Sequence, residues 1–141
     1  MSIKPKSRLR RILLRAIFAI SVVFVVVIIS LTLWIELELK KTCEKATQKY
    51  PGDKIEALMM SLETETYGLD THLYKENIHI IWALGQLGDK RALPFLREFS
   101  TGETCNHETN LCQGEIQSAI EKLERNQFNL PKFLWRGILN Y

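Results

Sequence analysis

Acidic residues are missing from the first 35 positions of this 141-residue chain, although six of its 19 basic residues lie there. The remainder holds the other 13 basic residues and all 16 acidic ones, and so has a formal charge of −3. The net charge of +3 therefore belongs to the N-terminal arm, and we predict no binding to nucleic acid. The basic residues of the arm are Lys4, Lys6, Arg8, Arg10, Arg11 and Arg15.

Sequence motifs of nucleotide binding and nucleophilic catalysis are also missing: there is no P-loop, no G-x-G-x-x-G and no G-x-S-x-G. His107-Glu108 begins like a zinc-protease motif but lacks the second histidine. Glu76 and His79, with His72 one turn earlier, form a single copy of a di-iron motif that requires two. We therefore predict no catalytic residue, no metal site, no cofactor and no enzymatic activity.

Charged residues are absent from the twenty positions between Ala16 and Ile35. A helix of this length is about 30 Å long, which matches the hydrocarbon core of a bilayer. The run is too long for the core of a signal peptide, and no small-residue cleavage site follows it. We predict a basic arm over 1–15 and an uncleaved, single-pass transmembrane helix over 16–35.

The charges on the two sides of this span predict its orientation. Six basic residues precede it, whereas the four charges that directly follow it cancel. The positive-inside rule then places the N-terminus in the cytoplasm and residues 36–141 across the membrane. In a bacterium, this is an inner-membrane protein with a periplasmic domain.

Beyond the span, apolar residues recur at the spacing of helices. A juxtamembrane helix is predicted over 36–51, and four helices follow within 52–126. Asp53 and Asp89 are suited to N-cap two of them, and Gly88 to the left-handed position that ends a helix. The apolar stripes are Leu39, Cys43, Ala46 and Tyr50; Ile55, Leu58, Met59 and Leu62; Ile80, Ala83, Leu84 and Leu87; Ala92, Phe95, Leu96 and Phe99; and Ile116, Ala119, Ile120 and Leu123.

The helical pattern within 52–126 repeats once, with a shift of 36–37 residues, and Gly52-Asp53-Lys54 recurs as Gly88-Asp89-Lys90. A repeated two-helix unit is typical of an α-solenoid, whose units must stack to bury their hydrophobic faces. We therefore predict an all-α fold, with a single transmembrane helix followed by a short solenoid of about two helical hairpins.

The residues from Ile80 to Leu96 read IIWALGQLGDKRALPFL. This stretch resembles the junction of a HEAT repeat of the short bacterial kind found in phycobilisome-lyase-like proteins, in which A-L-G-x-L-G-D is followed by x-R-A-(V/L)-P-x-L. The resemblance covers 52–126 and implies a helical binding surface for a protein partner. We expect a membrane-anchored interaction module or a small subunit of a membrane complex. The alternative is a lyase-like accessory protein that binds a metal or a chromophore.

Three cysteines follow the span, on the side where an oxidising compartment would favour disulfides. Cys105 and Cys112 flank a loop between the third and fourth helices of 52–126, and we predict a disulfide between them. The competing interpretations are free cysteines, a different pairing, or a metal site formed with His107. Cys43 would then be available for an intermolecular bond that makes a dimer.

The C-terminal segment, 127–141, is rich in aromatic and aliphatic residues, and Pro131 suits the first turn of a short helix. This segment would cap the open end of the solenoid, or would contact a partner or the membrane. The candidate contact residues are Phe133, Trp135, Ile138 and Tyr141.

Overall fold

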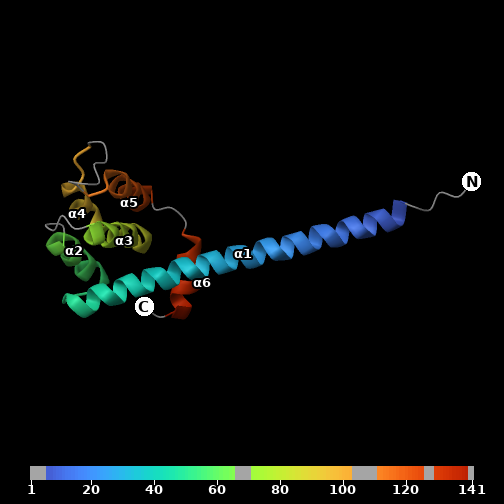
Figure 1. Ribbon diagram of the computed structural model, residues 1–141, viewed down its shortest axis with the longest axis horizontal. Coiled ribbons are helices and arrows are strands. Elements are labelled where there is room, and N and C mark those ends of the chain that lie inside the picture. Colours follow the sequence, from blue (N-terminus) through green and yellow to red (C-terminus); the bar gives the residue numbers. More distant parts are fainter. Residues whose placement is uncertain (1–5, 66–70, 103–110, 126–128, 140–141) are drawn as a thin grey trace, which may run out of the picture.

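The computed structural model describes residues 6–65, 71–102, 111–125 and 129–139. These residues form six helices and no strand, so the all-α fold class is confirmed for the described chain. Figure 1 shows α1 as a long rod. The C-terminal end of α1 packs against the helical domain, α6 crosses α1, and the N-terminal part of α1 extends away from the domain. The helices are α1 (Lys6–Lys49), α2 (Lys54–Glu65), α3 (Thr71–Leu87), α4 (Ala92–Glu98), α5 (Gln113–Arg125) and α6 (Leu130–Leu139).

Helix α1 joins the predicted transmembrane and juxtamembrane segments in one helix of 44 residues. It contains neither glycine nor proline, so its sequence has no residue that typically ends or kinks a helix before Pro51-Gly52. Every side chain from Leu9 to Val27 is exposed. Among the described residues, α1 is the one helix whose length and composition would allow it to cross a membrane.

The C-terminal half of α1 belongs to the domain core. Leu39, Cys43 and Ala46 are buried, as their spacing predicts. The same stripe extends back to Glu36 and Thr32, which are also buried. The apolar pattern did not indicate these two residues because both are polar.

Helix α3 is central in the domain and packs against α1, α2 and α5. Such covering on several sides is expected of a helix that is apolar around most of its circumference. Leu84 is fully buried, and Trp82 is half-buried against the core. The centres of the predicted stripes are confirmed as core: Ile55, Leu58, Leu62, Ile80, Ala83, Ala92, Leu96, Ile116, Ala119, Ile120 and Leu123 are buried, and Met59, Leu87, Phe95 and Phe99 pack against them.

The turn between α3 and α4 corrects one prediction. Gly88 ends α3 with a φ of 68°, the left-handed conformation expected of it. Asp89, however, is not the N-cap residue, because α4 begins at Ala92 and Arg91 holds the cap position. Asp89 instead begins an intervening turn, in which its carbonyl accepts the N–H of Ala92 at 3.2 Å.

Gly85 allows a close approach of α3 and α5. A Cβ atom added to Gly85 would lie 3.0 Å from the Cα of Ala119, a backbone atom that cannot rotate away. We predict that Gly85→Val forces the two helices apart and costs about 1–3 kcal/mol of stability. Thermal unfolding of the full chain in detergent, followed by circular dichroism, measures this. Gly137→Ala is the matched control, since no atom lies within 4 Å of its added Cβ; equal melting temperatures for the two variants would contradict the α3–α5 packing.

Candidate functional site

The repeated Gly-Asp-Lys sequence places two aspartates at one end of the domain. Asp53 N-caps α2 as predicted, because its Oδ1 accepts the N–H groups of Ile55 and Glu56, both at 3.0 Å. The Oε2 of Glu56 accepts the N–H of Asp53 at 3.1 Å, which completes a capping box. Asp89 makes the equivalent contact in its turn, where its Oδ1 accepts the N–H of Arg91 at 2.9 Å.

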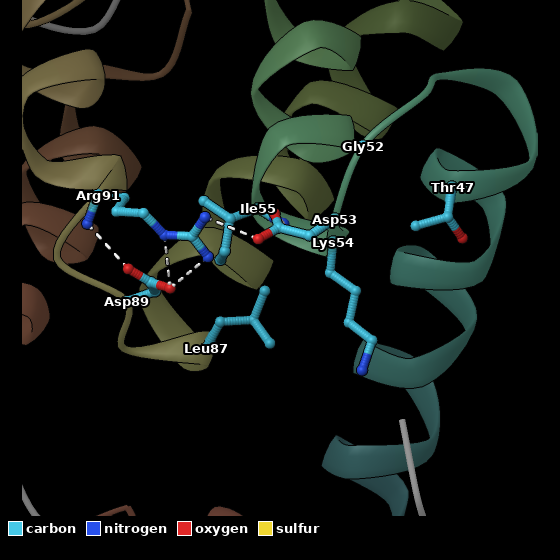
Figure 2. Close-up of a pocket in the computed structure, with 8 residues that line it drawn as sticks. All are labelled: Thr47, Gly52, Asp53, Lys54, Ile55, Leu87, Asp89 and Arg91. Atoms are coloured by element: carbon cyan, nitrogen blue, oxygen red, sulfur yellow. Dashed lines mark hydrogen bonds and ion pairs between the residues drawn. The ribbon is translucent and has the colours of Figure 1, made fainter.

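Arg91 joins the two Gly-Asp-Lys segments through these aspartates. Its Nη1 lies 2.7 Å from Oδ2 of Asp53, and its Nη2 lies 2.8 Å from Oδ2 of Asp89. Figure 2 shows the guanidinium group between the two carboxylates. The bridge thus joins the beginning of α2 to the turn between α3 and α4.

An open pocket of about 480 Å³ lies beside the Asp53–Arg91–Asp89 bridge. Ile55 and Leu87 give it apolar surface, and Lys54 extends along it toward α1 (Figure 2). The pocket thus combines charged groups of both signs with a small apolar surface. A polar peptide segment could form hydrogen bonds with the charged groups and pack against the apolar surface. The residues that line the pocket are Thr47, Gly52, Asp53, Lys54, Ile55, Leu87, Asp89 and Arg91.

The bridge favours the charged forms of all three groups. The backbone N–H of Glu56 lowers the pKa of Asp53, and the Arg91 guanidinium lowers it further. The Arg91 guanidinium is also the main cause of the lowered pKa of Asp89. In return, the carboxylates of Asp89 and Asp53 raise the pKa of Arg91.

We predict that the contribution of Arg91 to stability disappears in acid. The pKa values of Asp53 and Asp89 are lower in the folded chain than in the unfolded chain, so their contribution is present above about pH 4 and is lost as the pH falls through the folded values. Arg91→Met should lower the melting temperature slightly at pH 7, since exposed ion pairs contribute little. The difference from wild type should shrink below about pH 4. The exposed Lys90→Met is the control, and an Arg91 effect that persists unchanged at pH 3 would contradict an ionic bridge.

A second candidate surface is helix α6, which lies across α1. The Nε1 of Trp135 donates to Oγ1 of Thr32 at 3.0 Å, and Nη2 of Arg136 lies 3.3 Å from Oε1 of Glu36. The side chain of Glu36 is only 1% exposed and that of Arg136 17%, so this ion pair is largely removed from water. These contacts explain why two polar residues are buried in the α1 stripe.

Helix α6 is also attached to the end of α3. Arg136 donates to the carbonyl oxygens of Leu87 at 3.1 Å and Gln86 at 3.2 Å, which belong to the last turn of α3, where carbonyls lack intrahelical donors. The Nδ2 of Asn129 donates to the same Gln86 carbonyl at 3.1 Å, while Oδ1 of Asn129 accepts the N–H of Lys132 at 2.9 Å. Polar side chains therefore attach α6 to two other helices.

The four candidate contact residues of the C-terminal segment separate into different environments. Phe133 is 73% and Ile138 is 71% exposed, so both side chains lie at the surface of the described chain. Trp135 instead turns toward Thr32 and forms part of the fold. Tyr141 lies outside the described residues.

The dimer through Cys43 finds no support in the structure. Its side chain is buried among core residues, and this burial raises the pKa of the thiol to about 11. A second chain cannot reach the sulfur in the folded domain, and the reactive thiolate is scarce at neutral pH. Cys112 lies just before α5, whereas Cys105 is outside the described residues, so the disulfide between them stays a prediction.

Within the described part of the chain, no group of three His, Cys, Asp or Glu side chains lies close enough together to hold a metal ion. His79 is exposed. The side chains of His72 and Glu76, and the whole of His107, lie outside the description.

Neither of the two ionic contacts that organise these surfaces was predicted from the sequence. The repeated Gly-Asp-Lys was a usable signal for the bridge, because it places equivalent aspartates in neighbouring units, with Arg91 two residues after the second. The pair of Glu36 and Arg136 has no comparable signal, since the two residues are 100 positions apart.

Comparison with known proteins finds a family resemblance in the segment around Arg91. A family model described as PBS lyase HEAT-like repeat matches residues 78–101, which contain the second half of α3, the Gly88 turn and α4. The chain gives no match to curated proteins and none to solved structures. A HEAT-like repeat within an all-helical chain indicates a helical module for interaction with another protein.

Proposed function

We propose that this chain is a membrane-anchored HEAT-like protein-interaction module, or a small subunit of a membrane complex, without catalytic activity of its own. The observation that carries the proposal is the course of α1. Its exposed apolar part continues without interruption into the domain core, where Thr32 and Glu36 bind α6 and Leu39 is fully buried. Cleavage near residue 35 would separate Thr32 from the domain, so this helix suits a permanent anchor better than a removable leader.

The HEAT-like part of the proposal consists of two hairpins, α2–α3 and α4–α5. The packing of α2 on α3, of α4 on α5 and of α3 on α5 supports this arrangement. The Asp53–Arg91–Asp89 bridge joins the two units at the edge that holds the pocket. We place the contact with the protein partner at this pocket.

We propose that the N-terminus is cytoplasmic and that the domain lies on the extracytoplasmic side, which is the periplasm if the chain belongs to a bacterial inner membrane. The basic residues of the arm support this orientation. Detergent extraction, intact-mass measurement and an alkaline phosphatase fused to the C-terminus test it together. We expect an uncleaved chain with an active fusion, and loss of fusion activity when Arg8, Arg10 and Arg11 are changed to Glu. A species that starts near residue 36 would contradict the anchor.

The partner site is tested by crosslinking in intact membranes, followed by detergent solubilisation and pull-down. Thr47→Trp should fill part of the pocket and remove the crosslinked partner without unfolding the domain, because Thr47 is exposed. Lys90→Met, outside the pocket lining, is the matched control. A partner that the Thr47→Trp chain retains at wild-type yield would contradict contact at this pocket.

The disulfide between Cys105 and Cys112 is part of the same proposal, because it requires an oxidising compartment. The buried Gln113 already connects the start of α5 to the end of α4, since its Nε2 donates to the carbonyl of Phe99 at 3.1 Å and its Oε1 accepts the N–H of Thr101 at 2.9 Å. The bond should therefore add no more than about 3 kcal/mol. Thiol alkylation with and without reductant, followed by peptide mapping, should show both cysteines protected only before reduction. Alkylation of both in unreduced, exported protein would exclude the bond.

A further inference from the structure

We infer that the outward face of α6 lies in the lipid–water interface at the end of the membrane span, which makes α6 a second membrane contact of this chain. The inference rests on the proposed membrane anchor and adds to it a surface helix whose apolar side chains enter the boundary between headgroups and acyl chains.

The first argument is the distribution of side chains around α6. One face carries apolar residues and glycine at positions i, i+3, i+4, i+7 and i+8, the spacing of a continuous helical stripe. Phe133 and Ile138 on this face are both more than 70% exposed. The residues of the stripe are Leu130, Phe133, Leu134, Gly137 and Ile138.

The opposite face of α6 carries the polar contacts. Trp135 donates to Thr32, and Arg136 binds Glu36 and the end of α3. A helix on a domain surrounded by water normally turns its apolar stripe inward, whereas α6 turns its arginine inward and its apolar stripe outward. This arrangement is expected when lipid lies outside the helix.

The second argument is the level at which α6 crosses α1. Thr32 lies three residues before the end of the predicted span at Ile35, and Glu36 lies one residue after it. Figure 1 shows α6 across α1, between the helical domain and the free part of the rod. A helix that crosses a transmembrane helix at this level runs along the membrane surface, as interfacial helices do.

The test uses the full chain reconstituted in vesicles of phosphatidylcholine and phosphatidylglycerol. An environment-sensitive NBD label is attached to Ile138→Cys or Phe133→Cys, in a chain that carries Cys43→Ala, Cys105→Ser and Cys112→Ser. Glu98→Cys on the exposed surface of α4 is the aqueous control, and Phe24→Cys within the span is the control for depth. Each label is exposed to iodide in the water and, in separate samples, to lipids with a spin label near the headgroup or deep in the acyl chain, the deep label being the one that reports on position 24.

We expect the labels at 138 and 133 to be quenched by the shallow spin-labelled lipid and to show several-fold weaker iodide quenching than the label at 98. Iodide quenching equal to that at 98, with the label at 24 quenched by lipid, would overturn the inference and leave the anchor intact. Labels at 138 and 133 that are shielded from iodide but not quenched by lipid would overturn it in favour of a protein contact. A label at 24 that lipid does not quench would overturn the proposed anchor itself.

Because Cys43 is buried, its replacement is first checked by the melting temperature of the unlabelled chain. If that chain does not fold, Ile138→Trp is introduced into the chain with native cysteines, and the quenching of tryptophan fluorescence by brominated lipids is measured instead. A gain in lipid quenching over wild type supports the inference, and an unchanged value overturns it.

Discussion

Arg136→Met is expected to lower the free energy of unfolding by about 3–5 kcal/mol, because it leaves the buried carboxylate of Glu36 without its cationic partner. The same change removes the two Arg136 donors to the carbonyls of Gln86 and Leu87 at the end of α3. Helix α6 should then separate from α1, and trypsin should cleave the chain at Lys132 much faster than in wild type. Urea unfolding of the full chain in detergent micelles measures the energetic part of this result.

A double variant separates the charge from the packing. Glu36→Leu combined with Arg136→Met removes both members of the ion pair, so most of the lost stability should return, since apolar replacement of a buried pair is often close to neutral. Lys132→Met, which removes an exposed charge from the same helix, is the control and should change stability by less than about 0.5 kcal/mol. A loss below about 1 kcal/mol for Arg136→Met alone would show that the pair behaves like an exposed salt bridge.

Leu84→Ala is expected to cost about 2–5 kcal/mol, through lost burial and the cavity that remains between α3 and its neighbours. The side chain of Leu84 is 0% exposed on the helix that α1, α2 and α5 cover. A domain of this size has a total stability of about 5–15 kcal/mol, so the variant should lose a large share of it and melt at a clearly lower temperature.

Met60→Ala serves as the matched control for Leu84→Ala, since Met60 is 37% exposed on α2. Thermal unfolding followed by circular dichroism and by tryptophan fluorescence compares the two. A Leu84→Ala melting curve that coincides with that of Met60→Ala would contradict the central position of α3.

The helices of the domain could be predicted from the sequence because each buries a regular apolar stripe. Ile116, Ala119 and Ile120 lie at i, i+3 and i+4, a spacing that a helix brings to one face and a strand does not. The Gly88 turn was also predictable, because a glycine at the end of an apolar stripe can adopt the left-handed conformation that ends a helix. These features depend on short-range periodicity, which a single sequence records well.

The attachment of α6 could not be predicted, because it depends on polar residues far apart in the chain. Glu36 and Thr32 occupy core positions of α1 only because Arg136 and Trp135 satisfy them from the other end of the sequence. No periodic rule marks a buried charge, and its partner can be any cation that the fold brings near. The start of α4 was misplaced for a related reason: Arg91 forms its bridge from the turn before the helix, where Asp89 was expected to be the cap.

The uninterrupted course of α1 determines how the domain would stand on a membrane. No flexible stalk separates the proposed span from the core, because Leu39 lies only about 6 Å along the helix axis beyond Ile35. The domain therefore cannot swivel freely, and its pocket is held at a fixed height and a fixed azimuth relative to the span. Any tilt or rotation of the proposed span would move the domain with it, so a partner anchored in the same membrane would meet the pocket in a single orientation.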